Sequence, residues 1–172
     1  MNATETTTGE RLDLIEALGK HRYFLRFTVR DLTDEQAGIR STASELCLGG
    51  LIKHVTDTER QWADFILEGP AKSSGFDEAA MAAWAARFRM LPEDTLDEIL
   101  AQYQEVADRT DRIIRELPDL DVSHPLPEAP WFEPGAAWSA RRVLLHIIAE
   151  TAQHSGHADI LRESIDGAKS MG

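Results

Sequence analysis

One helical stripe near the C-terminus has aliphatic residues at both ends and ionisable residues in its middle. Its members are spaced three or four positions apart, which places them on one face of an α-helix. They are Val143, Ile147, Glu150, His154, His157 and Leu161. Such a stripe packs into a bundle, where burying an ionised carboxylate and two imidazoles costs several kcal/mol. A divalent metal ion would compensate all three groups at once, so the stripe predicts a metal site.

The charge of the chain argues against several classes of partner. Its 172 residues suffice for one domain with a hydrophobic core, and 30 acidic against 18 basic residues give a net charge of −12. Nucleic acid and anionic lipid surfaces both attract an excess of Lys and Arg. No transmembrane segment or secretory signal is recognisable, and the single cysteine, Cys47, cannot form an internal disulfide. We therefore expect a cytoplasmic protein with no nucleic-acid or membrane partner.

Helical periodicity and its breaks predict four long helices. We expect them at about residues 10–30, 44–68, 95–117 and 139–165, with a short helix around Trp84. No segment alternates with the period of a strand. The sequence therefore predicts an all-α fold, a four-helix bundle with long connections. We expect it to be a single domain over residues 1–172, with residues 1–9 flexible and residues 118–138 forming a long Pro-rich loop.

Several capping residues mark where these helices begin and end. Thr42 and Glu45 fit a capping box for the second helix. Ser139 is the expected N-cap of the fourth helix, and Gly167 is its expected C-cap. The first helix is expected to place His21 on the stripe formed by its leucines.

A third metal ligand is expected from the second helix. His54 stands on a stripe whose other members are largely apolar, so it is expected to point inward. Glu150 and His154 are one turn apart, and two facing helices can therefore place three ligands around one ion. Imidazole nitrogen and carboxylate oxygen suit Zn²⁺ or a similar cation. Three protein ligands also leave a position open for water or substrate, as in catalytic zinc sites.

Other interpretations of these residues are available. Taken singly, His54 or His21 is more typical of a hydrogen-bonded core residue than of a ligand. A di-iron site is rejected, because the third helix has no inward carboxylate and Glu150 and His154 lack the Glu-x-x-His spacing. His146 lies beside the stripe as a flanking group. Cys47 lies about 10 Å from His54 along the helix axis, which favours a packed, inert thiol.

Two segments carry a resemblance to a known family. The stretch WSARRVLLHIIAETAQHSGHADILRESIDG, from Trp138 to Gly167, resembles the last helix of the DinB-like superfamily and, more narrowly, its mycothiol-dependent thiol transferase branch. LGGLIKHVTDTERQW, from Leu48 to Trp62, resembles the second helix of that family. The resemblance implies a bundle that holds a divalent metal, zinc or nickel, through one residue of the second helix and two of the fourth.

The resemblance also implies which residues these are. His54, Glu150 and His154 occupy the ligand positions, with Glu150 where many DinB-like proteins have His. Mycothiol-dependent maleylpyruvate isomerases, which are similar in this respect, use two His and one Glu. His157 falls just beyond the family pattern, and His157 and Asp159 are second-sphere or substrate-contacting candidates.

The implied activity is transfer of a low-molecular-weight thiol, such as mycothiol, to a small electrophile. The metal would stabilise the thiol as thiolate, which is the nucleophilic form. Three alternatives remain open at this point: a metal-dependent isomerase or hydrolase on the same site, a non-catalytic stress-related metal-binding protein, and a bundle whose stripe is filled by hydrogen bonds. Related bundles often pair, so a homodimer is a further expectation.

Overall fold

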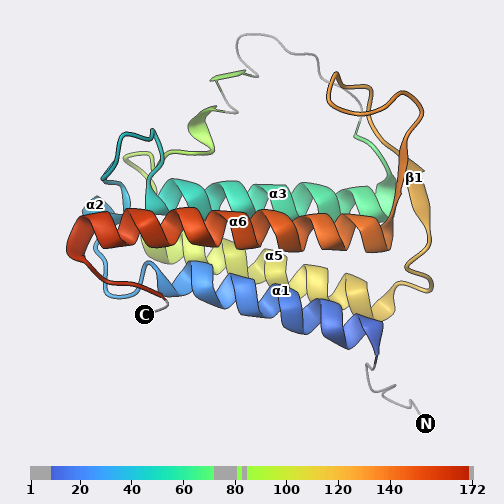
Figure 1. Ribbon diagram of the computed structural model, residues 1–172, viewed down its shortest axis with the longest axis horizontal. Helices are drawn as coiled ribbons and strands as arrows, with labels where there is room; N and C mark the ends of the chain where they lie inside the picture. The colour runs from blue at the N-terminus through green and yellow to red at the C-terminus, as the bar shows by residue number, and fades with distance from the viewer. Residues whose placement is uncertain (1–8, 72–80, 83–84, 171–172) are drawn as a thin grey trace.

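The computed structural model describes residues 9–71, 81–82 and 85–170 (Figure 1). It confirms the predicted helical bundle and adds two small elements, a one-turn helix and a two-stranded sheet. The elements are α1 (Glu10–Phe27), α2 (Asp34–Ala37), α3 (Leu48–Glu68), α5 (Leu96–Glu116), β1 (Ser123–Pro125), β2 (Ala137–Ser139) and α6 (Ala140–Asp166). Trp84 and residues 1–8 lie outside the described ranges, so the short helix at Trp84 and most of the flexible N-terminus stay predictions.

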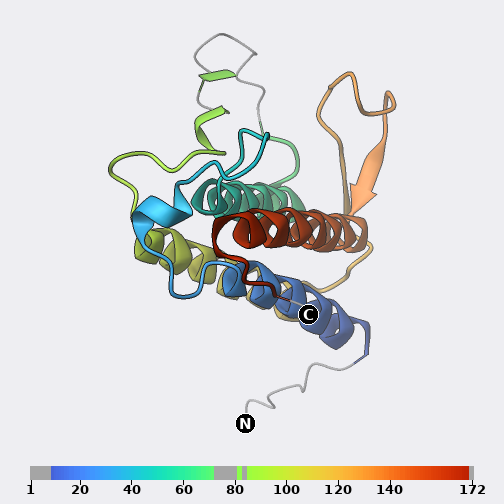
Figure 2. The same ribbon diagram turned by 60° about the vertical axis from the view of Figure 1, so that its left-hand side comes forward.

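The four long helices form a square in which successive helices are not all neighbours. Helix α6 packs against both α1 and α3, and α5 packs against the same two helices from the other side. Helices α1 and α3 therefore lie across one diagonal, and α5 and α6 across the other (Figures 1 and 2). The connections from α1 to α3 and from α5 to α6 join helices across the diagonals, whereas the connection from α3 to α5 joins neighbours. Within the described residues, no helix has the length and apolar content needed to cross a membrane.

The caps of α6 are as predicted, but those of α3 are not. The Ser139 hydroxyl accepts a hydrogen bond from the backbone N–H of Arg142, and Gly167 ends the helix at φ 79°. Helix α3 begins only after Cys47, which makes no side-chain cap. The predicted capping box at Thr42 and Glu45 is wrong, because Thr42 instead accepts a hydrogen bond from the Ser44 backbone in a local turn.

The expectation that the chain has no strand is also wrong. Strands β1 and β2 form an antiparallel pair that lies, apart from Ser139, in the segment expected to be a loop, with His124 opposite Trp138. Each strand has only three residues, which is too short to show alternation in the sequence. The His124 ring packs over Gly69, and its Nε2 lies 3.2 Å from the Ile66 carbonyl oxygen at the end of α3. This contact ties the sheet to the bundle.

A layer of buried polar side chains divides the hydrophobic core into two apolar clusters. On each long helix these polar residues lie between the residues of one cluster and those of the other. We call this set the polar layer; its members are Arg22 on α1, Thr56 and Glu59 on α3, Thr110 on α5, and Thr151 and Ser155 on α6. The hydroxyl groups donate to backbone carbonyls four residues earlier in their own helices, at 2.7–3.0 Å. Their hydrogen-bonding requirement is thus met locally.

The ionic centre of the polar layer is the pair Arg22–Glu59, which joins the diagonal helices α1 and α3. Arg22 Nε donates to Glu59 Oε2 at 3.2 Å, and a second guanidinium nitrogen donates to the other carboxylate oxygen. A third donates to Asp111 Oδ1 of α5 at 2.8 Å. The sequence placed His21 on this stripe of α1, but Arg22 is the buried residue and His21 is only half-buried. Three helices are therefore fixed to one another through a single guanidinium group.

Removing one member of this pair is expected to destabilise the protein strongly. Arg22→Met would leave the Glu59 carboxylate, whose side chain is 0% exposed, buried without its partner. We expect the free energy of unfolding, measured with urea, to fall by about 3–5 kcal/mol. The double variant Arg22→Met/Glu59→Leu is expected to recover much of that loss.

An exposed ion pair provides the matched control. Arg40→Met removes the contact between Arg40 and Glu45, whose side chains are 44% and 75% exposed. We expect it to cost less than about 1 kcal/mol. Equal losses in the Arg22 and Arg40 variants would contradict the role assigned to the buried pair.

Candidate metal centre

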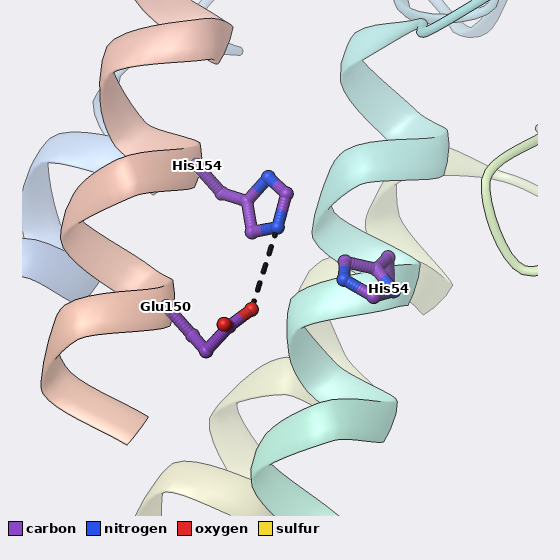
Figure 3. Close-up of side chains that lie close together, drawn as sticks. All are labelled: His54, Glu150 and His154. Atoms are coloured by element: carbon purple, nitrogen blue, oxygen red, sulfur yellow. Dashed lines mark ion pairs between the residues drawn. The ribbon is translucent and has the colours of Figure 1, made fainter. Parts of the chain in front are cut away.

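Three side chains from two adjacent helices converge at one point on the bundle. His54 projects from α3, while Glu150 and His154 project from successive turns of α6 (Figure 3). One ligand atom from each residue lies within 4.8 Å of those from the other two. Among the described residues, no other group of three or more His, Cys, Asp and Glu side chains has the spacing needed to hold an ion. The structure thus brings together the three residues that the sequence selected as ligands, which we call the triad.

The triad lies at the rim of the bundle and not at its centre, which corrects one expectation. Glu150, His154 and His157 are half-buried, while the fully buried line along this part of α6 runs through Thr151, Ser155 and Ala158. The predicted stripe assumed a repeat of 3.5 residues per turn, and a straight helix drifts away from that repeat by about 20° per heptad. The side chains of Glu150 and His154 remain 28% and 13% exposed. The triad is consequently accessible from solvent.

Burial favours the neutral form of both imidazoles of the triad. Glu150 Oε2 lies 3.7 Å from His154 Nε2. Burial, reinforced by the nearby His154 and Arg87, lowers the pKa of His54 to about 4 despite the opposing charge of Asp57. Burial also lowers the pKa of His154, although Glu150 acts in the opposite direction. At neutral pH both rings therefore offer a lone pair, as metal binding requires.

The two second-sphere candidates have different surroundings. His157 Nδ1 lies 3.4 Å from His154 Nδ1, so His157 contacts a member of the triad directly. The Asp159 carboxylate accepts a hydrogen bond of 2.6 Å from the backbone N–H of Ser170, in the C-terminal segment. The structure therefore places His157 at the triad and Asp159 against the chain terminus. A role for Asp159 in substrate contact stays a prediction.

The remaining residues considered from the sequence lie around the triad without joining it. His146 Nε2 is 4.0 Å from Glu150 Oε1, and its ring meets the rings of Trp62 and Trp138 edge-on. The two indoles stack at 5.0 Å between ring centroids, and Trp138 is a residue of β2. The backbone carbonyl of His21 accepts a hydrogen bond from Ser155. His146 thus connects the triad to an aromatic cluster.

The sequence did not predict one neighbour of the triad. The ring of Phe88 stacks on His54, with 4.1 Å between ring centroids and 23° between planes. Phe88 belongs to the connection between α3 and α5, where the sequence predicts a short amphipathic helix that includes it, but that repeat does not show which residue its ring contacts. Cys47 is buried beside it, with its Sγ 3.9 Å from the Phe88 carbonyl oxygen. This agrees with the packed thiol expected from the sequence.

The low pKa of His54 predicts how the metal-free protein responds to acid. Between pH 6.5 and about 4 the unfolded chain takes up a proton on His54 that the folded protein excludes. The contribution of this group to stability is therefore lost as the pH falls through that window. We expect the free energy of unfolding, measured with urea in the presence of a chelator, to vary less steeply with pH in His54→Gln than in the wild type. If the two free energies of unfolding changed equally with pH, the lowered pKa assigned to His54 would be wrong.

Comparisons with known proteins agree with this architecture. The structure resembles that of a conserved protein from Enterococcus faecalis with a TM-score of 0.69 and 12% identity, over 94% of this chain and 100% of the other. It also resembles the colibactin self-resistance protein ClbS, solved in complex with a dsDNA, with a TM-score of 0.60 and 17% identity, over 89% and 95%. At these identities the likeness shows the fold alone. No curated protein matches the sequence.

The sequence itself identifies the family. The model of the MST family, mycothiol-S-transferase, matches residues 13–167. This range includes all four long helices apart from the first three residues of α1, and it contains the whole triad. The chain therefore belongs to the mycothiol-S-transferase family.

Proposed function

We propose that His54, Glu150 and His154 bind a divalent cation, with zinc preferred and nickel as the alternative. Ligands about 2.1 Å from a tetrahedral ion lie about 3.4 Å from one another. The triad atoms lie within 4.8 Å of one another, so small side-chain rotations suffice to reach that spacing. Two neutral imidazoles and one carboxylate make a donor set that suits both cations. This convergence of three ligand atoms is the observation that carries the proposal.

We infer that the protein is a metal-dependent S-transferase that joins mycothiol, or a similar low-molecular-weight thiol, to a small electrophile. Membership of the family supports the thiol, and the triad supports the cation. A cation with an open position would favour the thiolate form of the co-substrate, which is the attacking nucleophile.

The side chains of the triad have separate roles in this proposal. Glu150 supplies the negative charge that balances the cation, and it lies between His146 and His154 at 4.0 and 3.7 Å. The imidazoles bind as neutral ligands, because burial disfavours their protonated forms. The position at the rim leaves room for a thiol and an electrophile to approach from solvent. Cys47 is buried and packed against Phe88, so it is not a candidate nucleophile.

We assign His157 the role of orienting His154. The Nδ1 atoms of the two rings are 3.4 Å apart, so the N–H of His154 Nδ1 can donate to the lone pair of His157 Nδ1. This arrangement leaves the lone pair on His154 Nε2, the nitrogen that faces Glu150. Histidine ligands usually have the second ring nitrogen fixed by such a partner.

Loss of a triad member is expected to abolish both metal binding and thiol transfer. We expect elemental analysis of untagged protein to find a divalent metal in the wild type and not in His154→Ala. With mycothiol and monochlorobimane, the rate for His154→Ala is expected to fall by more than about 100-fold, since even second-sphere changes cost about 10–100-fold. Cys47→Ser should retain metal and rate. Equal rates for the wild type and His154→Ala would rule out the transferase proposal.

Substitution of His157 is expected to weaken metal binding without removing a ligand. His157→Phe keeps a ring but lacks the acceptor, so we expect Zn²⁺ affinity to fall by about 10–100-fold. His157→Gln retains an acceptor oxygen and should lose less. Competition with a chromogenic chelator measures both affinities. Unchanged affinity in His157→Phe would show that His154 needs no such partner.

A further inference from the structure

The two imidazoles of the triad are held in different ways. The ring of His154 has a partner for its second nitrogen in His157, at 3.4 Å. Among the described residues, no hydrogen bond to the ring of His54 is found. The face of that ring is instead covered by Phe88, which stacks on it at 4.1 Å and 23°. Phe88 is therefore the group best placed to fix the orientation of His54.

The position of Phe88 is itself fixed by α3, the helix that carries His54. Arg87 Nε lies 3.8 Å from Asp57 Oδ2, and the ammonium of Lys53 donates to the Arg89 carbonyl oxygen at 3.1 Å. Phe88 is held between these two contacts, with its carbonyl oxygen 3.9 Å from Cys47 Sγ. Three consecutive residues of the connection are thus attached to the first three turns of α3.

Two glycines at the start of α3 allow this close approach. A Cβ atom at Gly50 would overlap the carbonyl group of Phe88. A Cβ atom at Gly49 would lie 2.7 Å from the sulfur of Met90. Glycine inside a helix costs about 1 kcal/mol relative to alanine, so two in succession require a compensating reason. Here the bare backbone forms a seat for the connection, and we call Gly49 and Gly50 the glycine seat.

We propose that Phe88, held by the glycine seat, is a positioning residue for His54. It restricts rotation of the imidazole and keeps a ring nitrogen directed at Glu150 and His154. A ligand that is ordered before the ion arrives loses less conformational entropy on binding, which raises affinity. The inference rests on the proposed metal-binding function of the triad. It also means that the connection between α3 and α5 completes a site whose ligands all come from α3 and α6.

The test compares three substitutions in the connection and one in the glycine seat. Phe88→Leu keeps an apolar side chain without an aromatic face, and Phe88→Tyr keeps the face. Gly50→Ala displaces the Phe88 backbone, whereas Met90→Ala alters the same connection without removing the ring. We expect Phe88→Leu and Gly50→Ala to lower Zn²⁺ affinity about tenfold, in the range for second-sphere partners. Phe88→Tyr and Met90→Ala should remain close to the wild type.

A second measurement needs no metal. Proton NMR of the metal-free protein reports the His54 ring protons, which the Phe88 ring current shields in the stacked arrangement. We expect this shielding to be lost in Phe88→Leu and retained in Phe88→Tyr. Unchanged His54 shifts in Phe88→Leu would overturn the inference, as would unchanged Zn²⁺ affinity in that variant. A wild-type protein that binds no Zn²⁺ would overturn the proposed function, whatever the NMR spectra show.

Discussion

The buried pair of Arg22 and Glu59 is the interaction on which the rest of this bundle depends. Moving two charges out of water is unfavourable unless each finds good partners, and here one guanidinium contacts carboxylates from two other helices. Apolar contacts are less directional than an ion pair, and this contact requires one relative position of α1, α3 and α5. The polar layer therefore sets the register of the helices, and the apolar clusters on both sides supply the burial.

The triad lies on the same turns of α3 and α6 as the polar layer, but its side chains point from an adjacent face of each helix. Glu59 is little more than one turn beyond His54, while Thr151 and Ser155 directly follow Glu150 and His154. A shift of α3 by one turn would break the ion pair and would also move His54 away from the other two members of the triad. The geometry of the candidate site and the stability of the core therefore depend on one arrangement of helices.

Helix periodicity predicted the parts of the molecule that obey a regular repeat. The four long helices, the caps Ser139 and Gly167, and the meeting of Glu150, His154 and His54 all follow from spacing and chain breaks. The same reasoning failed where small angular differences decide burial, so it selected His21 in place of Arg22 and placed the triad too deep. It could not find the stacking of Phe88 on His54 or the short strands, because these depend on tertiary contacts and not on a local pattern.

The diagonal arrangement of the helices has a consequence for the order in which they can pack. Helix α6 follows the other long helices in the sequence, yet it covers both α1 and α3 and carries two of the three triad residues. Until α6 docks, the apolar faces of α1 and α3 that it covers stay exposed, and His54 lacks the other two members of the triad. Assembly of the triad is therefore one event with the docking of α6.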